Sequence, residues 1–430
     1  MESIFKPSSK SLLITLLFTS VMLLVNYTTG SDFLSFLVTV IYIAMVLFVK
    51  SDNLLPCLLY ILSFHQILCY GNVRLIGFVI IVAIIRVALS SGKDSAKIIL
   101  FFLFYFLLHS LVSSENSFKF ATISSIVLIF FLYPASILYK DKNSKDSIIF
   151  FIVGFLVSSF FGFLRPSLPR LNEMAGDVDD VSPLIDTLRF SGIFYDSNFY
   201  AIGALMVLFV LLFRTISKTN QNFKNVILTL LFALLVFFLG ATTFSKSFII
   251  SGLLLLGLFF VQGAKGAGIK TIIGGVFLAG IVAMFLSSEI SAFFDIYSYR
   301  FEDTTDMNSL TTNRTDIWKM YMEDMSNISF SQFLIGHGVG PHRLPAAHNT
   351  YLEMFYNFGL FGFLSEIALV IASAKNVIKG RKLAKHSLFI IALVFMLFFN
   401  LSAYTFASTW TILIVLFICC RHDNVFAPKA

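Results

Sequence analysis

The stretch SLLITLLFTSVMLLVNYT, from Ser11 to Thr28, is the first of about fourteen apolar runs that approach the length needed to cross a bilayer. A spanning helix needs roughly 20 mostly apolar residues, and packed bundles tolerate somewhat shorter ones. Lipid offers the backbone no hydrogen-bond partners, so such runs form helices rather than open strands. The pattern predicts an all-α, polytopic membrane protein with about 12 to 14 transmembrane helices.

The composition supports the same class. Hydrophobic residues make up 57% of the chain and charged residues only 13%, whereas soluble domains carry about 25% charged residues. All four cysteines lie within apolar runs, so we expect neither disulfides nor a zinc site. The first run has no small-residue cleavage site behind it, which favours an uncleaved span over a signal peptide.

Two hydrophilic stretches interrupt the spans, near residues 165–190 and 288–350. They divide the chain into an N-terminal transmembrane bundle (1–164), a first loop with central helices (165–287), a large loop (288–350) and C-terminal helices (351–430). The expected spans are 11–28, 33–49, 54–70, 73–90, 97–113, 119–139, 147–164, 191–213, 225–242, 244–262, 270–287, 351–374, 387–400 and 403–420.

The connections between these spans alternate in charge. One set carries 20 Lys and Arg against six acidic residues, a net charge of +14, and the other carries 10 against 16, a net charge of −6. Cytoplasmic connections are enriched in Lys and Arg, so both termini should be cytoplasmic and both polar loops should lie on the outer face. The overall charge of +7 is then a sorting signal and gives no reason to expect nucleic acid.

Three polar features mark the first loop and the connection after the ninth span. Arg165 begins what we interpret as irregular, solvated chain. Asp196 and Asn198 lie about one turn inside the next helix, where polar groups either face a cavity or make helix caps and interhelical hydrogen bonds. Lys246 follows a very short connection near the interface, where its ammonium could either snorkel to the lipid headgroups or face a phosphate.

The large loop carries an arginine and two aromatic residues at helical spacing. Thr311 to Asn313 can cap a helix that begins near Arg314. Arg314, Trp318 and Tyr321 then fall on one face of that helix. A guanidinium binds phosphate in two-pronged fashion and aromatic rings cover sugar faces, which favours a ligand site. The alternative is an amphipathic helix that lies on the membrane with Trp318 among the headgroups.

The end of the large loop combines glycines with three histidines. The glycines at 336, 338 and 340 lack the strand and lysine of a nucleotide site, so we interpret them as a tight reversal before His348. His337, His342 and His348 are irregularly spaced and have no acidic fourth ligand, so no metal is expected. His348 directly precedes the next helix and is the best placed general base.

Together these segments resemble the superfamily of O-antigen ligases and Wzy-type polysaccharide polymerases. The match covers about residues 185–365. The matching motifs are Arg189-x-Ser191-Gly192-Ile193-Phe194-x-Asp196-x-Asn198, Thr243-Phe244-Ser245-Lys246-Ser247, Asn313-Arg314-x-x-x-Trp318, Leu334-Ile335-Gly336-x-Gly338-x-Gly340 and His348-Asn349-x-Tyr351-Leu352-Glu353-x-x-x-x-x-Gly359-x-x-Gly362. Their order and spacing make the set more specific than any one motif.

The resemblance implies a metal-independent glycosyltransferase without a cofactor, acting on a glycan carried by undecaprenyl diphosphate. It implies that His348 is the base and that Arg314 and Lys246 bind the diphosphate. The family usually has arginine where Lys246 stands, and lysine keeps the charge but loses the two-pronged fork. Further substrate contacts are expected from Arg189, Asn198, Arg300, Trp318, Asn349, Tyr351 and Glu353.

These expectations describe a polymerase that joins lipid-linked repeat units of O-antigen or capsule at the periplasmic face of a bacterial inner membrane. Its partners would be donor and acceptor lipids, membrane lipids, a chain-length regulator and a flippase. An O-antigen ligase that transfers glycan to lipid A-core is the alternative, since the motifs do not separate the two. A lipid-linked-oligosaccharide flippase fits less well, because Arg86, Glu353 and Glu366 are few ionisable residues for a polar path through the membrane.

Overall fold

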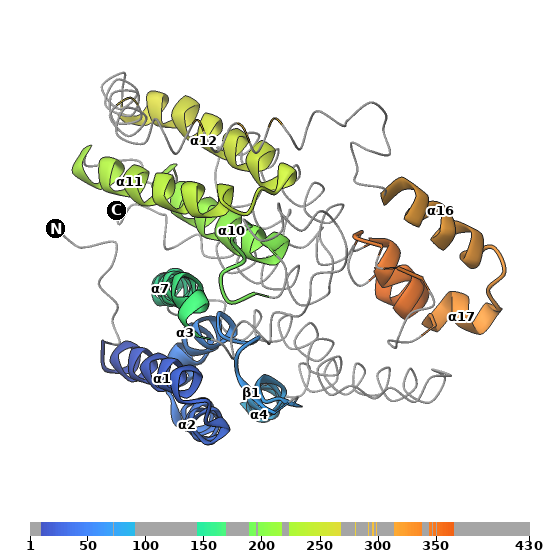
Figure 1. Ribbon diagram of the computed structural model, residues 1–430, viewed down its shortest axis with the longest axis horizontal. Helices are drawn as coiled ribbons and strands as arrows, with labels where there is room; N and C mark the ends of the chain where they lie inside the picture. Colours follow the sequence, from blue (N-terminus) through green and yellow to red (C-terminus); the bar gives the residue numbers. More distant parts are fainter. Residues whose placement is uncertain are drawn as a thin grey trace.

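The computed structural model of the chain is mostly helical (Figure 1). The structure describes residues 10–71, 73–90, 144–168, 189–194, 197–216, 223–267, 280, 291, 295, 298, 314–337, 344–345, 347–349 and 351–364. The expected spans at 97–113, 119–139, 387–400 and 403–420 lie outside these residues, as does the span at 270–287 apart from residue 280, and Arg300, His342 and Glu366 lie outside them too.

The helices begin and end close to where the apolar runs do. They are α1 (Lys10–Thr29), α2 (Asp32–Phe48), α3 (Ser51–Leu62), α4 (Ile76–Ser90), α7 (Ser144–Leu164), α10 (Ser197–Ile216), α11 (Phe223–Ala241), α12 (Lys246–Ala267), α16 (Arg314–Met325) and α17 (Phe330–Ile335). A short 3-10 turn, η1 (Arg165–Ser167), follows α7, and two short strands, β1 (Cys69–Tyr70) and β2 (Val73–Arg74), form one antiparallel hairpin. Residues 351–364 are also helical.

Two of the described helices are long and apolar enough to cross a membrane, α1 and the Ser147–Leu164 part of α7. Shorter apolar helices occupy Asp32–Phe48, Ser51–Leu62, Ser197–Leu212, Ile227–Ala241 and Lys246–Gly257. Large apolar side chains face outward from this part of the chain, among them Ile14 at 66% and Phe48 at 84% exposure. Exposed apolar surface of this kind marks contact with a membrane or with other protein.

The expected span at 54–70 is wrong in its second half. Helix α3 ends at Leu62 after 12 residues, a rise of about 18 Å against a hydrocarbon core of about 30 Å. Polar residues follow, and Gly71 adopts a φ of +53°, which permits the hairpin turn. The Gly71 N–H donates to the Asp32 carboxylate at 2.9 Å and joins the hairpin to the start of α2.

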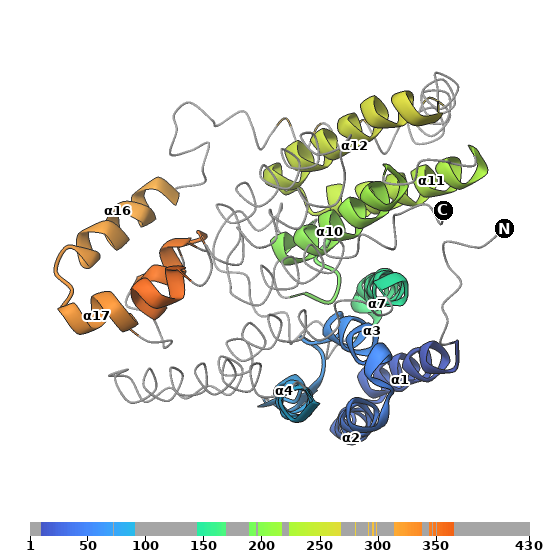
Figure 2. The same ribbon diagram turned by 180° about the vertical axis from the view of Figure 1, so that it is seen from behind.

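The apolar helices of the described N-terminal and central parts pack into one bundle, in which α3 lies against α7 and α10 lies against both α11 and α12 (Figures 1 and 2). Hydrogen bonds between buried hydroxyl groups join neighbouring helices at single positions. Thr19 donates to the Tyr42 hydroxyl at 3.0 Å, and Tyr200 donates to the Ser159 hydroxyl at 2.9 Å. Hydrogen bonds of this kind help to fix the register of apolar helices, whose other contacts are largely non-directional.

The hydrogen-bond partners of Arg86 are backbone carbonyl groups. Its guanidinium donates to the carbonyl oxygens of Val46 and Val49 at the C-terminal end of α2. The last carbonyls of a helix have no partner within the helix and carry the negative end of its dipole. Arg86 therefore acts as a cap on α2, which accounts for one of the few charges inside the apolar part of the chain.

Candidate functional site

The structure brings the first two motifs together although they are some fifty residues apart in the chain. The Arg189 guanidinium donates from Nε to the Thr243 carbonyl at 3.0 Å and from Nη2 to the Asn198 side-chain oxygen at 3.4 Å. The neighbouring Phe190 N–H donates to the Thr242 carbonyl at 3.0 Å. The segment 189–194 therefore lies along the connection between α11 and α12, close to where α10 begins.

Gly192 makes this close arrangement sterically possible. Its φ is +61°, a conformation that side chains with a Cβ rarely adopt. A Cβ on Gly192 would lie 2.6 Å from the Tyr200 ring, and a Cβ on Gly162 of α7 would overlap the Gly192 backbone. Gly192 is thus required by its backbone conformation and by the Tyr200 ring, and Gly162 is required because the turn rests on α7 at that point.

The short connection after α11 places Lys246 at the start of α12. Thr243 is fully buried, and its hydroxyl donates to the Gly240 carbonyl at 2.6 Å while accepting from the Ser245 N–H at 3.3 Å. Phe244 has a positive φ of +51°. Lys246 is the first residue of α12, and its side chain is partly buried. A lysine at the positive end of a helix dipole makes a favourable environment for an anion.

A second group of site residues forms around His348. Asn349 caps the helix over 351–364, because its side-chain oxygen accepts from the N–H groups of Tyr351 at 3.0 Å and Leu352 at 3.2 Å. The Glu353 N–H also donates to the Asn349 carbonyl at 3.0 Å. Asn349 was expected to contact substrate. In the structure its amide oxygen is committed to the helix start, and the substrate role of Asn349 stays a prediction.

His348 is held in an unusual backbone conformation between two fixed neighbours. Its φ is +49°, which is uncommon outside glycine and costs about 1–3 kcal/mol where the surroundings impose it. On one side, the buried Ala347 N–H donates to the Glu353 carboxylate at 3.1 Å. On the other side stands the Asn349 cap. Glu353 is itself only 9% exposed, so a buried carboxylate holds the segment that carries the candidate base.

Helix α16 begins at Arg314, as expected, and packs its aromatic face on the same segment. Trp318 Nε1 donates to the Ala347 carbonyl at 2.8 Å, and the Tyr321 hydroxyl donates to the Pro345 carbonyl at 3.0 Å. Tyr321 is 1% exposed. The shared face of Trp318 and Tyr321 is therefore confirmed. It meets protein, which differs from the alternative of a helix with Trp318 among lipid headgroups.

Gly336 ends α17 in a backbone conformation that favours glycine, and the expected reversal through residues 338–340 lies outside the described residues. Gly336 has a φ of +87°, and a Cβ there would overlap the backbone of Asn357. Gly359 has a φ of +62°, and a Cβ there would overlap the backbone at Leu334. Two backbone segments therefore touch without side chains between them. The glycines at 338 and 340 lie outside the described residues.

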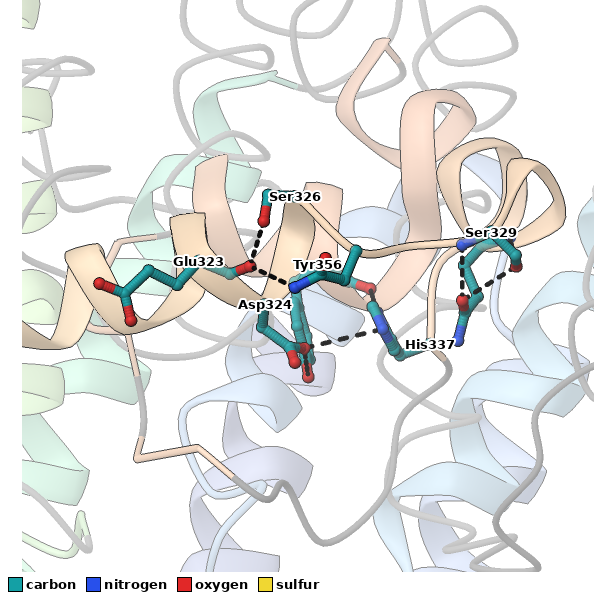
Figure 3. A network of polar contacts seen from close by, with 8 residues as sticks. Glu323, Asp324, Ser326, Ser329, His337 and Tyr356 are labelled. Atoms are coloured by element: carbon teal, nitrogen blue, oxygen red, sulfur yellow. Dashed lines mark hydrogen bonds and ion pairs between the residues drawn. The ribbon is translucent and has the colours of Figure 1, made fainter.

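His337 joins a polar network that the sequence did not predict (Figure 3). Its ring stacks on Tyr356 with centroids 4.2 Å apart, and its Nε2 lies 3.8 Å from the Asp324 carboxylate. The Tyr356 hydroxyl donates to the same carboxylate at 2.8 Å. The network joins the end of α16, the residue that follows the Gly336 cap of α17 and the helix over 351–364. It gives His337 a packing role, separate from that of His348.

One site neighbour was misjudged from the sequence. Arg165 was interpreted as solvated loop, but it is half-buried in η1 and donates from Nη1 to the Ser191 hydroxyl at 2.5 Å. Burial lowers the pKa of the Arg165 guanidinium from its ordinary value. Its position directly after an apolar run and before Pro166 was the available signal. Asp324 and Tyr356 carried no comparable signal.

Among the residues that the structure describes, no group of three or more His, Cys, Asp and Glu side chains is arranged to hold a metal ion. Cations near a helix start stabilise developing negative charge, and an imidazole transfers protons near neutral pH.

Neither a protein-family model nor a curated protein matches this chain.

Proposed function

We propose that the chain is a polymerase that joins undecaprenyl-diphosphate-linked repeat units into O-antigen or capsular polysaccharide at the periplasmic face of a bacterial inner membrane. It would have about 12 to 14 spans, cytoplasmic termini and a large periplasmic loop over 288–350. The observation that carries the proposal is the contact of Arg189 with Thr243 and Asn198, which brings the Arg189 motif to the connection that leads to Lys246.

The chemistry assigned to this region follows from its charges. A lipid diphosphate leaves with its negative charge when the bond between the anomeric carbon and the phosphate oxygen breaks. Arg189 and Lys246 of this region, together with Arg314 of the large loop, would offset that charge, the type of electrostatic stabilisation that often contributes most to catalysis. A guanidinium can bind two phosphate oxygens at once, and an ammonium acts as a point charge.

His348 would take the proton from the attacking hydroxyl of the acceptor glycan. The new glycosidic bond forms as undecaprenyl diphosphate departs, and the proton passes to the imidazole. Glu353 and Asn349 support this role, because they fix the backbone on both sides of His348. A base held in one orientation needs no reorganisation when the substrates arrive.

Two experiments test the proposal at different levels. A strain lacking the gene should make lipopolysaccharide with single repeat units on lipid A-core. Bare core with accumulated lipid-linked polymer would instead identify a ligase, and wild-type glycan would refute both.

The second experiment tests sidedness with a cysteine at Ser309 in an otherwise cysteine-free variant. The cysteine should react with a membrane-impermeant maleimide in intact spheroplasts. Reaction only after the inner membrane is broken would place the large loop in the cytoplasm and overturn the mechanism.

A further inference from the structure

The end of α7 forms an extended contact with the segment that carries Arg189. Gly162 lies so close to the Gly192 backbone that a side chain on Gly162 would overlap it. The Phe163 ring stacks on Phe190, with centroids 4.7 Å apart. These contacts come from a part of the chain that showed no functional motif in its sequence.

Arg165 adds the polar component of this contact. Its Nη1 donates to the Ser191 hydroxyl at 2.5 Å, and Ser191 stands between Phe190 and the required Gly192 turn. Burying a guanidinium costs free energy unless it is hydrogen-bonded, so a half-buried arginine at this place is more than a solvated loop residue. The segment 189–194 is thus held by two guanidinium groups. Arg165 of η1 donates to Ser191 within the segment, and Arg189 of the segment donates to Thr243 and Asn198.

We infer that Arg165 is a positioning residue of the anion site, which it serves by holding Ser191 so that the adjacent turn presents Arg189 at Thr243 and Asn198. This inference rests on the proposed lipid-diphosphate function. Arg165 acts through the turn and is not assigned a contact with substrate. Since the segment has little regular structure of its own, its orientation depends on what it rests against, and α7 supplies that support.

The test measures binding of undecaprenyl diphosphate without sugar to the purified full-length protein in detergent micelles. Arg165→Ala should raise the Kd about tenfold, as expected for loss of a hydrogen bond to a charged group. Ser191→Ala removes the acceptor and leaves the arginine in place, so it should raise the Kd by a similar factor. The double variant should bind no worse than Arg165→Ala, because both changes remove the same bond.

The coupling to Arg189 separates positioning from general damage. In an Arg189→Ala background, Arg165→Ala should cause no further loss of affinity, because the residue through which it acts is gone. Arg165→Lys, which can still donate to Ser191, should recover part of the affinity. The matched control is Tyr42→Phe, which also removes a buried hydrogen bond and should lower the melting temperature without changing the Kd.

The outcomes distinguish the two proposals. If Arg189→Ala binds undecaprenyl diphosphate like the parent, the proposed lipid-diphosphate site is wrong. If Arg189→Ala loses binding and Arg165→Ala does not, only the positioning role is wrong. An equal loss of affinity from Arg165→Ala in both backgrounds would also overturn the positioning role, since it would mean damage that does not pass through Arg189.

Discussion

The region around Arg189 and the region around His348 are built in different ways. In the first, backbones approach one another directly, at Gly162 and Gly192, and two guanidinium groups bond the short segment between the helices. In the second, side chains bond to backbone, as Asn349, Glu353, Trp318 and Tyr321 do around the segment 344–349. A close-packed glycine contact accepts no added atom, whereas a set of hydrogen bonds can lose one member and keep its shape.

This difference suits the two tasks that we assign. Cations that bind a diphosphate contact several oxygens, so the region around Arg189 needs a rigid backbone more than it needs the exact placement of one atom. A general base must meet one proton, so its backbone has to be held on both sides. The two regions should therefore respond differently to mutation.

The largest effect is expected at the base itself. His348→Ala should reduce glycan elongation about 10²–10⁴-fold and leave binding of the lipid donor largely intact, because a positioned acid–base group contributes to the chemical step. The measurement is polymer laddering from purified lipid-linked repeat units, with a chelator present. Undiminished ladders, or loss of the parent's activity on adding chelator, would contradict the mechanism.

The cations should come next. Arg314→Lys should lose at least about tenfold in activity, since one point charge cannot replace two parallel hydrogen bonds to a diphosphate. Lys246→Arg should keep activity and Lys246→Ala should lose it. Normal polymerisation by Arg314→Ala at equal protein level would remove Arg314 from the site.

Substitution of Gly192 should act by lowering the stability of the protein. Gly192→Ala should cost about 2–4 kcal/mol, because alanine disfavours this φ and its methyl group would meet the Tyr200 ring. The control is Gly257→Ala in α12, where no atom lies within 4 Å of an added Cβ. That change should leave the melting temperature equal or slightly higher, since alanine favours helix. Equal behaviour of the two variants would contradict the packing argument.

A smaller effect is expected at Glu353. Glu353→Ala leaves the Ala347 N–H without its carboxylate partner and should lower kcat about tenfold by loosening His348. Glu353→Gln keeps an oxygen that can accept from Ala347, so it should retain most of the activity. A glutamine variant as impaired as the alanine variant would show that the charge of Glu353 matters, and not only its hydrogen bond.

The smallest effect on activity is expected at His337. His337→Ala should stay within a few-fold of the parent and lower stability by about 1 kcal/mol through loss of the stack on Tyr356. Tyr356→Phe keeps the stacked ring and removes only the bond to Asp324, so it separates the two contributions. A collapse of activity in His337→Ala without a change in stability would give this histidine a direct role.

The sequence predicted the helices better than it predicted the contacts between them. Apolar runs place α1, α2, α7 and α11 closely because lipid forces each run to satisfy its own backbone. The prediction of a span at 54–70 was wrong because hydropathy alone does not show where a helix ends. Helix α3 is followed by polar residues and by a hairpin that turns at Gly71.

The residue types of the candidate site could be predicted from the sequence, but most of the contacts between those residues could not. The start of α16 at Arg314 and the shared face of Trp318 and Tyr321 follow from helical spacing. The contact of Arg189 with Thr243 joins distant segments, so no local pattern could give it. The network of His337, Asp324 and Tyr356 was invisible for the same reason, since its members come from three separate elements.

The brevity of α3 has a consequence for how the chain is made. Nine of its 12 residues are buried, a helix of this length is too short to span a bilayer alone, and its largest contact is with α7. The ribosome synthesises α7 much later than α3. In the membrane insertion that we propose, α3 would first pack on α1 and α2 and would gain its largest contact only when α7 arrives, just before the residues that lead to the Arg189 turn emerge.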